Sequence, residues 1–253
     1  MTELMVVIPH YGDDTLLERC IASLNDAGIL SRQIVVVSQN PPMQNRLFTW
    51  AINHGIDMAL ARREDPNGEC VIWLLNNDTV VQKDTHTQAL RCFEEEGWER
   101  CGIVGTRCQA LSEPDFIFWG GSKRCYPTGQ HKSGRISLDQ LKDRTEEEWV
   151  TFASAFINAR VIREIGLLDK TLKHVCSDAD YSFRARAAGW RCYYEPKSSI
   201  LHAVGSSHHT ADNNLKRIMG EDMERFYDKW IGNGLFKQLT EYKDREHLRR
   251  PGQ

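Results

Sequence analysis

The chain has 253 residues, of which 41% are hydrophobic, enough for one large α/β domain or two small ones. Its 32 basic and 35 acidic residues are mixed along the chain and give a formal net charge of −3. This balance lacks the basic stripe typical of a nucleic-acid-binding protein, so it gives no strong sign of a nucleic acid partner. Eight cysteines occur without a CxxC pair, which argues against a zinc site and indicates free thiols.

The first residues lack the basic and apolar regions of a signal peptide. The longest apolar runs have the length of strands and are too short to span a bilayer. We therefore expect a cytoplasmic protein, and the sequence leaves peripheral contact with the inner face of the membrane open.

Strand and helix patterns alternate in the first part of the chain. Met5–Ile8, Ile34–Val37 and Val71–Leu75 are apolar runs typical of buried strands, whereas Thr15–Asn25 and Leu47–Leu60 have helical spacing. This alternation predicts a parallel sheet with right-handed crossovers, which binds ligands at the carboxyl ends of its strands. The loop after the first strand has no GxGxxG, which argues against a dinucleotide-binding dehydrogenase.

The second half is less regular. Phe116–Gly121 predicts a strand that enters a turn, and the polar composition of residues 127–148 predicts a mobile excursion. The remaining predicted elements are a strand at Val150–Ile157, helices at Ala159–Ile165 and Ser177–Ala188, a strand at Arg191–Tyr194, and a polar helical tail after about 211. An aromatic stripe in this tail makes it a candidate packing surface or dimer element.

Asn76, Asn77 and Asp78 follow the third predicted strand. A carboxylate at that place can hold a divalent cation that bridges a diphosphate and neutralises the charge of a leaving group. The alternative is an ordinary strand-to-turn junction, where Asn and Asp are common. The residues alone leave both interpretations open.

Ordered segments between about residues 4 and 208 resemble the family 2 inverting glycosyltransferases, and within them a branch that contains rhamnosyltransferases. The segments are VVIPHY, IVVVSQN, LLNNDT, ASAFINARVIREIGLLDKTL and SDADYSFRARAAGWRCYYEPKSSILHAVGSS. The resemblance implies an α/β protein of GT-A type, with a mostly parallel Rossmann-like sheet flanked by helices. It divides the chain into a nucleotide-binding half at about 1–110, an acceptor half at about 111–210 and a helical C-terminal extension at 211–253.

The resemblance also implies a metal site for Mn²⁺ or Mg²⁺. Asp78 matches the metal-binding aspartate of the family's D-x-D motif, and Asn76 stands where the first aspartate usually is. His202 matches a C-terminal histidine that faces the same cation or the diphosphate. Without the resemblance, a packed histidine at the end of a strand is the simpler interpretation of His202.

Asp178 matches the family's proposed general base, which takes the proton of the acceptor hydroxyl during an inverting transfer. The same stretch is also a capping pattern, in which Asp180 caps the helix while Asp178 faces the acceptor. Ser177 replaces the family's usual glutamate, which leaves the choice between the two aspartates open.

The implied donor is a dTDP- or UDP-sugar. Pro9 and Tyr11 of the first loop are retained, His10 replaces a threonine, and Ser38 replaces the aspartate that contacts the base. The predicted donor-binding residues are Pro9, His10, Tyr11, Ser38, Asn76, Asn77 and Asp78. On the acceptor side we predict Asp180 and Trp119, although Trp119 could equally be a core residue, and Ser206–Thr210 resembles a loop that closes over donor phosphates.

The predicted reaction is transfer of a hexosyl or deoxyhexosyl group to a glycan, a lipid-linked oligosaccharide or another hydroxyl acceptor, in the assembly of a surface polysaccharide or glycoconjugate. Three alternatives stay open. The first is a catalytically inactive sugar-nucleotide-binding module, and the second is a glycosyltransferase that acts on modified DNA bases. The third is a nucleotidyltransferase, which the absence of a Gly-rich basic loop after the first strand argues against.

Overall fold

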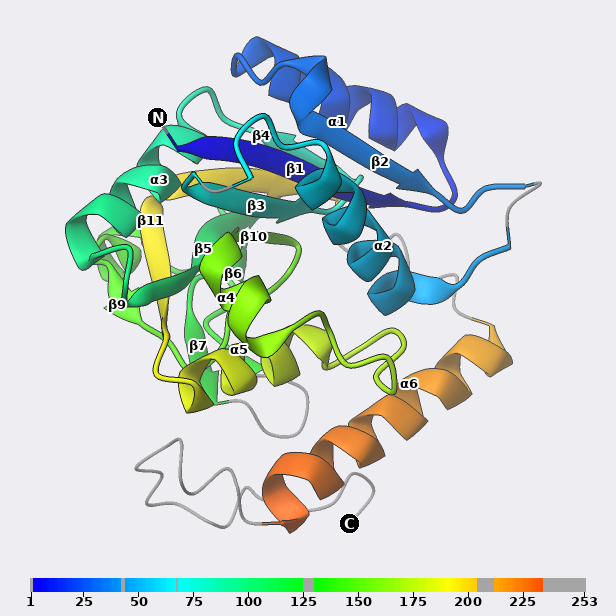
Figure 1. Cartoon of the computed structure of the whole chain (residues 1–253). Coiled ribbons are helices and arrows are strands. Elements are labelled where there is room, and N and C mark those ends of the chain that lie inside the picture. Colours follow the sequence, from blue (N-terminus) through cyan, green and yellow to red (C-terminus); the bar gives the residue numbers. More distant parts are fainter. Residues whose placement is uncertain (1, 42–43, 67, 125–129, 204–211, 234–253) are drawn as a thin grey trace.

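A computed structural model describes residues 2–41, 44–66, 68–124, 130–203 and 212–233. Its central sheet has the strand order β2-β1-β3-β10-β5-β11-β4 (Figure 1). These strands are β1 (Glu3–His10), β2 (Ile34–Ser38), β3 (Cys70–Leu75), β4 (Thr79–Val81), β5 (Cys101–Ala110), β10 (Ser154–Asn158) and β11 (Arg191–His202).

Most of this sheet runs in one direction. Strands β2, β1 and β3 are mutually parallel, and β5 is parallel to β11. Strand β10 lies antiparallel between β3 and β5, so both of those groups share one direction, and β4 is antiparallel to β11. The prediction of a mostly parallel Rossmann-like sheet is therefore confirmed.

Short strands extend the sheet beyond this path. Strand β6 (Ile117–Trp119) pairs with β5, and β9 (Thr145–Glu146) pairs with β11. A separate pair consists of β7 (Ser122–Arg124) and β8 (Gln130–His131). The polar stretch predicted as an excursion thus contains short strands where the structure describes it.

Helices cover both faces of the sheet. They are α1 (Asp14–Asp26), α2 (Leu47–Ala61), α3 (Thr85–Glu96), α4 (Ala159–Ile165), α5 (Ser177–Ala187) and α6 (Asn213–Phe226), with short helical turns at Ser31–Gln33, Leu138–Leu141 and Tyr227–Gly232. Figure 1 shows α1 and α2 on opposite sides of β1 and β2. No helix in the described ranges is long and apolar enough to cross a membrane.

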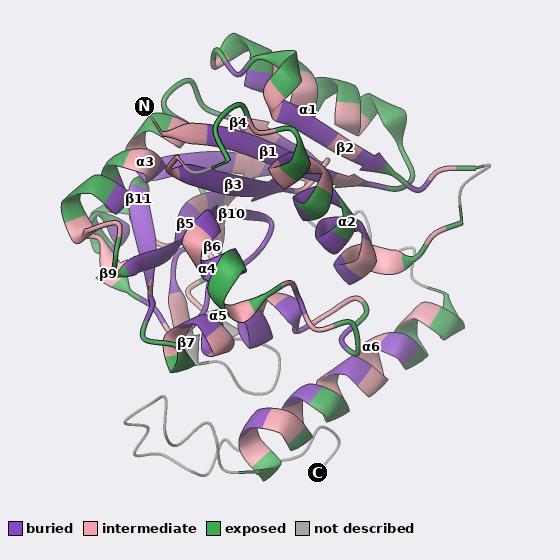
Figure 2. Cartoon of the chain, in the orientation of Figure 1, coloured by how far each residue is buried: buried purple, intermediate pink, exposed green. Residues whose placement is uncertain are grey.

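The core lies on both faces of β3, where all six residues are buried (Figure 2). Trp73 of β3 stacks on Phe156 of the neighbouring β10, with ring centroids 4.5 Å apart. Burial on both faces explains why β3 reads as a continuous apolar run rather than as an alternation. The seven cysteines in the described ranges are buried and form no disulfide.

Helix α6 packs its apolar stripe on its own domain. Phe226 and Trp230 contact Phe183 of α5, with ring centroids 5.9 Å and 5.2 Å apart. The predicted tail helix is confirmed over Asn213–Phe226. The stripe that made the tail a candidate dimer element is largely occupied by this internal contact, and the proposed division of the chain at 210 stays a prediction.

Two central elements differ from the sequence prediction. The sequence patterns do not predict helix α3 or strand β5, although β5 lies inside the sheet between β10 and β11. The predicted strand at Val150–Ile157 begins only at Ser154, where the pairing of β10 with β3 starts.

Candidate active site

The carboxyl ends of β1, β2 and β3 meet at one edge of the sheet. His10 lies opposite Ser38 in the parallel register of β1 and β2. The Nδ1 atom of His10 lies 2.9 Å from the side-chain nitrogen of Asn77, in the loop after β3. The fold therefore gathers the predicted donor-binding residues, and it leaves Tyr11 and Ser38 exposed at this edge.

His10 is itself buried and is the centre of a polar network. Its Nε2 atom lies 2.8 Å from the carboxylate of Asp14. Asn40 completes the network, since its side chain accepts the N–H of Gly12 at 2.7 Å and donates to the carbonyl of Gly12 at 3.0 Å. Sequence reasoning missed Asn40 and Asp14 as site residues. Asn40 lies in the loop after β2 and Asp14 is the first residue of α1, and their places just after strand ends are the signal that could have found them.

Asp78 and His202 face each other on the same side of the sheet. The Nε2 atom of His202 lies 3.0 Å from Oδ1 of Asp78. Antiparallel pairing of β4 with β11 creates this contact, because Thr79 lies opposite His202 and the N–H of Ala203 donates to the carbonyl of Asp78 at 2.9 Å. Both side chains are more than nine-tenths buried.

This pair fits a divalent cation. Carboxylate oxygen and imidazole nitrogen together suit Mn²⁺, and Mg²⁺ prefers the oxygen. Two ligands on adjacent vertices of an octahedron with bonds of about 2.1 Å lie about 3.0 Å apart, which is the separation of Asp78 and His202. In the described ranges no third His, Cys, Asp or Glu joins them, so other ligands would come from water and a substrate diphosphate.

Asp178 stands at the first turn of α5, next to the end of β3. Its carboxylate accepts the backbone N–H groups of Ala179 and Phe152. The carbonyl of Ala153, the residue after Phe152, accepts the N–H of Asn76 at 3.0 Å and so links this region to the end of β3. Burial raises the pKa of Asp178 to about 6, and the backbone hydrogen bonds lower it only in part. A carboxylate of this kind is a stronger base than an exposed one and stays ionised at neutral pH.

Asp180 has a different environment. It is fully buried, accepts the indole N–H of Trp230 at 2.8 Å, and lies 2.7 Å from the Lys229 ammonium. Cys176, in the left-handed region at φ 63°, precedes α5 in the cap position, so Asp180 does not cap this helix. The predicted acceptor role of Asp180 is not supported by this placement, because its carboxylate faces the C-terminal segment and is shielded from solvent.

Asp222 of α6 anchors the segment that precedes α5, residues 173–175. This buried carboxylate accepts the successive backbone N–H groups of Lys173, His174 and Val175 at 3.0, 2.7 and 3.1 Å. Asp178 thus lies between two anchors from the C-terminal segment, one at residues 173–175 and one at Asp180. Sequence reasoning missed Asp222. The signal that could have found it is its position as the one acidic residue in the buried stripe that also contains Ile218, Phe226 and Trp230.

Trp119 is fully buried and packs against Trp149 and Tyr194, with ring centroids 6.2 Å and 5.6 Å apart. Its indole has no exposed face on which a sugar could pack. Trp119 is therefore a core residue, which was the alternative to the predicted acceptor platform. The predicted phosphate-covering loop at Ser206–Thr210 lies outside the described residues.

Solved structures share this fold. A structure described as GalNAc-T7 with UDP, GalNAc and Mn²⁺ matches with a TM-score of 0.61 and 13% identity, over 96% of this chain and 53% of the other. The mannosyltransferase PcManGT from Pyrobaculum calidifontis, in complex with GDP-Man and Mn²⁺, matches with a TM-score of 0.52 and 14% identity, over 91% of this chain and 64% of the other. This chain thus spans only about half to two-thirds of these proteins.

Comparison with curated protein sequences gives no significant match. The family model described as "Glycosyltransferase like family 2" matches residues 3–220, which include the strand ends, Asp78, Asp178 and His202. With this match over most of its length, and with a GT-A architecture, the chain belongs to the family 2 glycosyltransferases.

Proposed function

We propose that this protein is an inverting glycosyltransferase that moves a sugar from a dTDP- or UDP-sugar to a hydroxyl acceptor, with Mn²⁺ or Mg²⁺ bound by Asp78 and His202. The contact between these two side chains is the observation that supports the proposal most directly. It lies on the same side of the sheet as the strand ends that carry Pro9, Ser38 and Asn77, where a nucleotide has access.

The chain supplies the base for the reaction. In a single displacement, the acceptor oxygen attacks the anomeric carbon and loses its proton to Asp178, while the bond from that carbon to the diphosphate breaks. A cation between Asp78 and His202 would neutralise the charge that develops on the departing diphosphate. The backbone hydrogen bonds from Phe152 and Ala179 fix the carboxylate of Asp178, which favours proton transfer in one geometry.

The acceptor class follows from the sequence resemblance. Similarity to rhamnosyltransferase-like enzymes is the basis for proposing a glycan or lipid-linked acceptor, and a surface polysaccharide or glycoconjugate as product. The transferred group would then be a hexosyl or deoxyhexosyl unit. If the acceptor is lipid-linked, the protein would contact the inner face of the membrane from the cytoplasm.

Release of nucleoside diphosphate tests this proposal. The wild-type chain is incubated with dTDP- and UDP-sugars and Mn²⁺, with water or added oligosaccharides as acceptors. We expect Asp178→Asn to lower turnover by about 10²- to 10⁴-fold with nucleotide binding retained, because only the base is removed. The matched variant Asp139→Asn, at an exposed position, keeps wild-type turnover. Nucleotide binding without release from any donor would instead identify an inactive binding module.

A further inference from the structure

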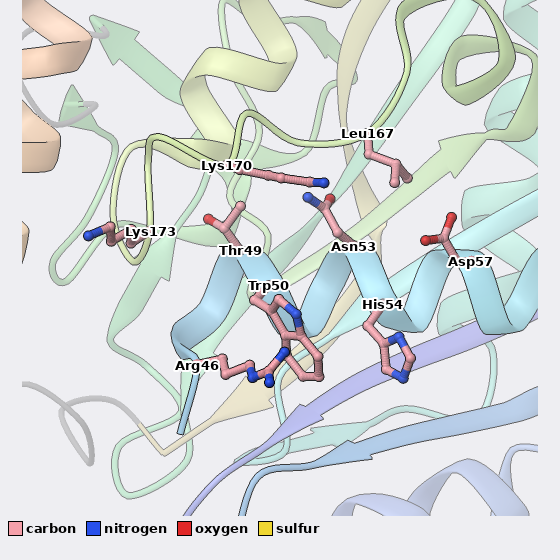
Figure 3. Close-up of a pocket in the computed structure, with 9 residues that line it drawn as sticks. All are labelled: Arg46, Thr49, Trp50, Asn53, His54, Asp57, Leu167, Lys170 and Lys173. Atoms are coloured by element: carbon pink, nitrogen blue, oxygen red, sulfur yellow. The ribbon is translucent and has the colours of Figure 1, made fainter. Parts of the chain in front are cut away.

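Helix α2 and the segment 167–173 line an open cavity of about 330 Å³ (Figure 3). This volume lies in the range of small-molecule sites, which begins near 300 Å³. The cavity is distinct from the strand ends described above, because none of the proposed donor or metal residues lines it.

The two walls of this cavity are joined by buried polar side chains. Asn53 of α2 accepts the N–H of Leu168 and donates to its carbonyl, both at 2.9 Å. Thr49 donates its N–H to the carbonyl of Lys173 at 3.1 Å and its hydroxyl to the carbonyl of Leu172. Asn53 and Thr49 are at most 5% exposed. The cavity is therefore preformed, and a ligand need not order its walls.

Positive charge gathers around the cavity. Arg46, Lys170 and Lys173 line it and are exposed, and in the described ranges none of them pairs with a carboxylate. Asp57 is the one carboxylate among the lining residues. Such an excess is notable in a chain of net charge −3, in which arginines such as Arg63 are held in ion pairs. The site is therefore suited to an anion.

An aromatic surface lies beside these cations. The guanidinium of Arg46 stands 4.8 Å from the ring centroid of Trp50, and the ring of His54 stacks on Trp50 at 5.0 Å. Figure 3 shows these three side chains on one flank of α2 and Lys170 on the other. A ligand with both an apolar ring face and a negative group would use both features.

We propose that this cavity binds an acidic sugar of the acceptor, a pyranose ring that carries a carboxylate or a phosphate. The inference rests on the proposed glycosyltransferase function and names the substrate class. The segment that forms one wall continues directly into α5, so Lys173 stands five residues before Asp178. An acceptor residue held here would lie next to the element that carries the base.

Binding measurements in the absence of donor test this inference. The first probe is a tetrasaccharide that contains glucuronate, compared with the same tetrasaccharide after its carboxyl groups are reduced. The second probe is glucose 1-phosphate. The test variants are Arg46→Gln and the double variant Lys170→Ala/Lys173→Ala. The double variant Lys142→Ala/Lys216→Ala is the control, because it removes the same charge from exposed lysines outside the cavity.

We expect the acidic tetrasaccharide to bind the wild type at least about tenfold more tightly than its reduced form, and the test variants to lose about tenfold or more in affinity. The control should keep wild-type affinity. Binding of glucose 1-phosphate alone, with the same dependence on the variants, would assign the anion to a sugar phosphate. Absence of binding by both probes, or equal loss in test and control variants, would overturn the inference.

Binding of UDP and dTDP with Mn²⁺, measured on the same proteins, separates this inference from the proposed function. Unchanged nucleotide binding in Lys170→Ala/Lys173→Ala is expected. If nucleotide affinity falls instead, the cavity belongs to the donor site and the inference is wrong. If the wild type binds acidic sugar but no nucleotide, the cavity assignment stands and the proposed function fails.

Discussion

The imidazole Nε2 of His202 lies 3.0 Å from the carboxylate of Asp78, although 124 residues separate them in the chain (202 − 78). The contact exists because β4 turns back after β3 and pairs antiparallel with the end of β11. The strand order thus brings the two proposed metal ligands together, and the backbone pairing of β4 with β11 fixes the position of both. The proposed catalytic base, Asp178, belongs to a third element, α5, which Asp222 anchors independently of this pair.

The pH dependence of turnover follows from the burial of Asp178. Its pKa lies at about 6, above the ordinary value of 3.8, because burial penalises the charged form. At saturating donor we expect turnover to rise about tenfold per pH unit below 6 and to level off above it. A flat profile between pH 4.5 and 7, with the protein folded throughout, would contradict the assignment of the base.

The same shift affects stability with a defined sign. Because the folded pKa exceeds the unfolded one, the contribution of Asp178 to stability is complete below about 3.8 and is lost as the pH rises through 6. Asp178→Asn removes this loss. Urea unfolding should therefore show the variant gaining stability relative to the wild type between pH 4 and 6, with a constant difference above that window.

Removal of the Asp222 side chain should destabilise the approach to α5. Asp222→Ala leaves three backbone N–H groups without their acceptor, and we expect a loss of about 3 kcal/mol in the free energy of unfolding, or roughly 6–12 °C in Tm. Glu224→Ala, at an exposed position of the same helix, should change stability by at most about 0.5 kcal/mol. Equal melting temperatures for the two variants would mean that Asp222 does not hold this segment.

Gly55 and Gly220 provide a matched pair of helical glycines. A Cβ atom at Gly55 would lie 2.3 Å from Val7 Cγ1, whereas at Gly220 no atom lies within 4 Å. Gly55→Ala should therefore lower the free energy of unfolding by about 1–3 kcal/mol through overpacking of α2 on β1. Gly220→Ala should raise it by up to about 1 kcal/mol through helix propensity. Thermal or urea unfolding of both variants checks the two signs, and a stabilising Gly55→Ala would show that α2 has room to shift.

The sequence predicts the first part of the fold well, because β1, β2 and β3 are continuous apolar runs between helices with clear spacing. It hides β5, because Gly102 and Gly105 weaken the strand signal. The structure needs glycine at both positions, since a Cβ at Gly105 would lie 2.5 Å from Val150 and one at Gly102 would lie 2.8 Å from Trp190. Strand β11 is also longer than predicted, because it resumes after an irregularity between Glu195 and Ser199.

Residue spacing in the sequence identifies candidate site residues but does not distinguish between neighbouring residues of the same type. The family resemblance predicts that Asp78 and His202 face one cation, and the structure brings their side chains within 3.0 Å of each other. Two aspartates in one helical turn, in contrast, look alike in sequence. Only tertiary packing separates them, since Asp180 meets Trp230 and Asp178 meets Phe152. Trp119 shows the same limit, because an aromatic residue before Gly120 is equally suited to a core and to a sugar platform until its burial is known.

The most direct test of the central claim is thermal stability with UDP, dTDP, GDP and CDP, each with and without Mn²⁺, for the wild type and Asp78→Ala. A nucleotide at about a hundred times its Kd stabilises the folded state by roughly 2.7 kcal/mol, or about 5–10 °C here. The account predicts such a shift with UDP or dTDP, only with Mn²⁺, and its loss in Asp78→Ala. A shift that is independent of Mn²⁺, or that is retained in Asp78→Ala, would contradict the assigned metal site.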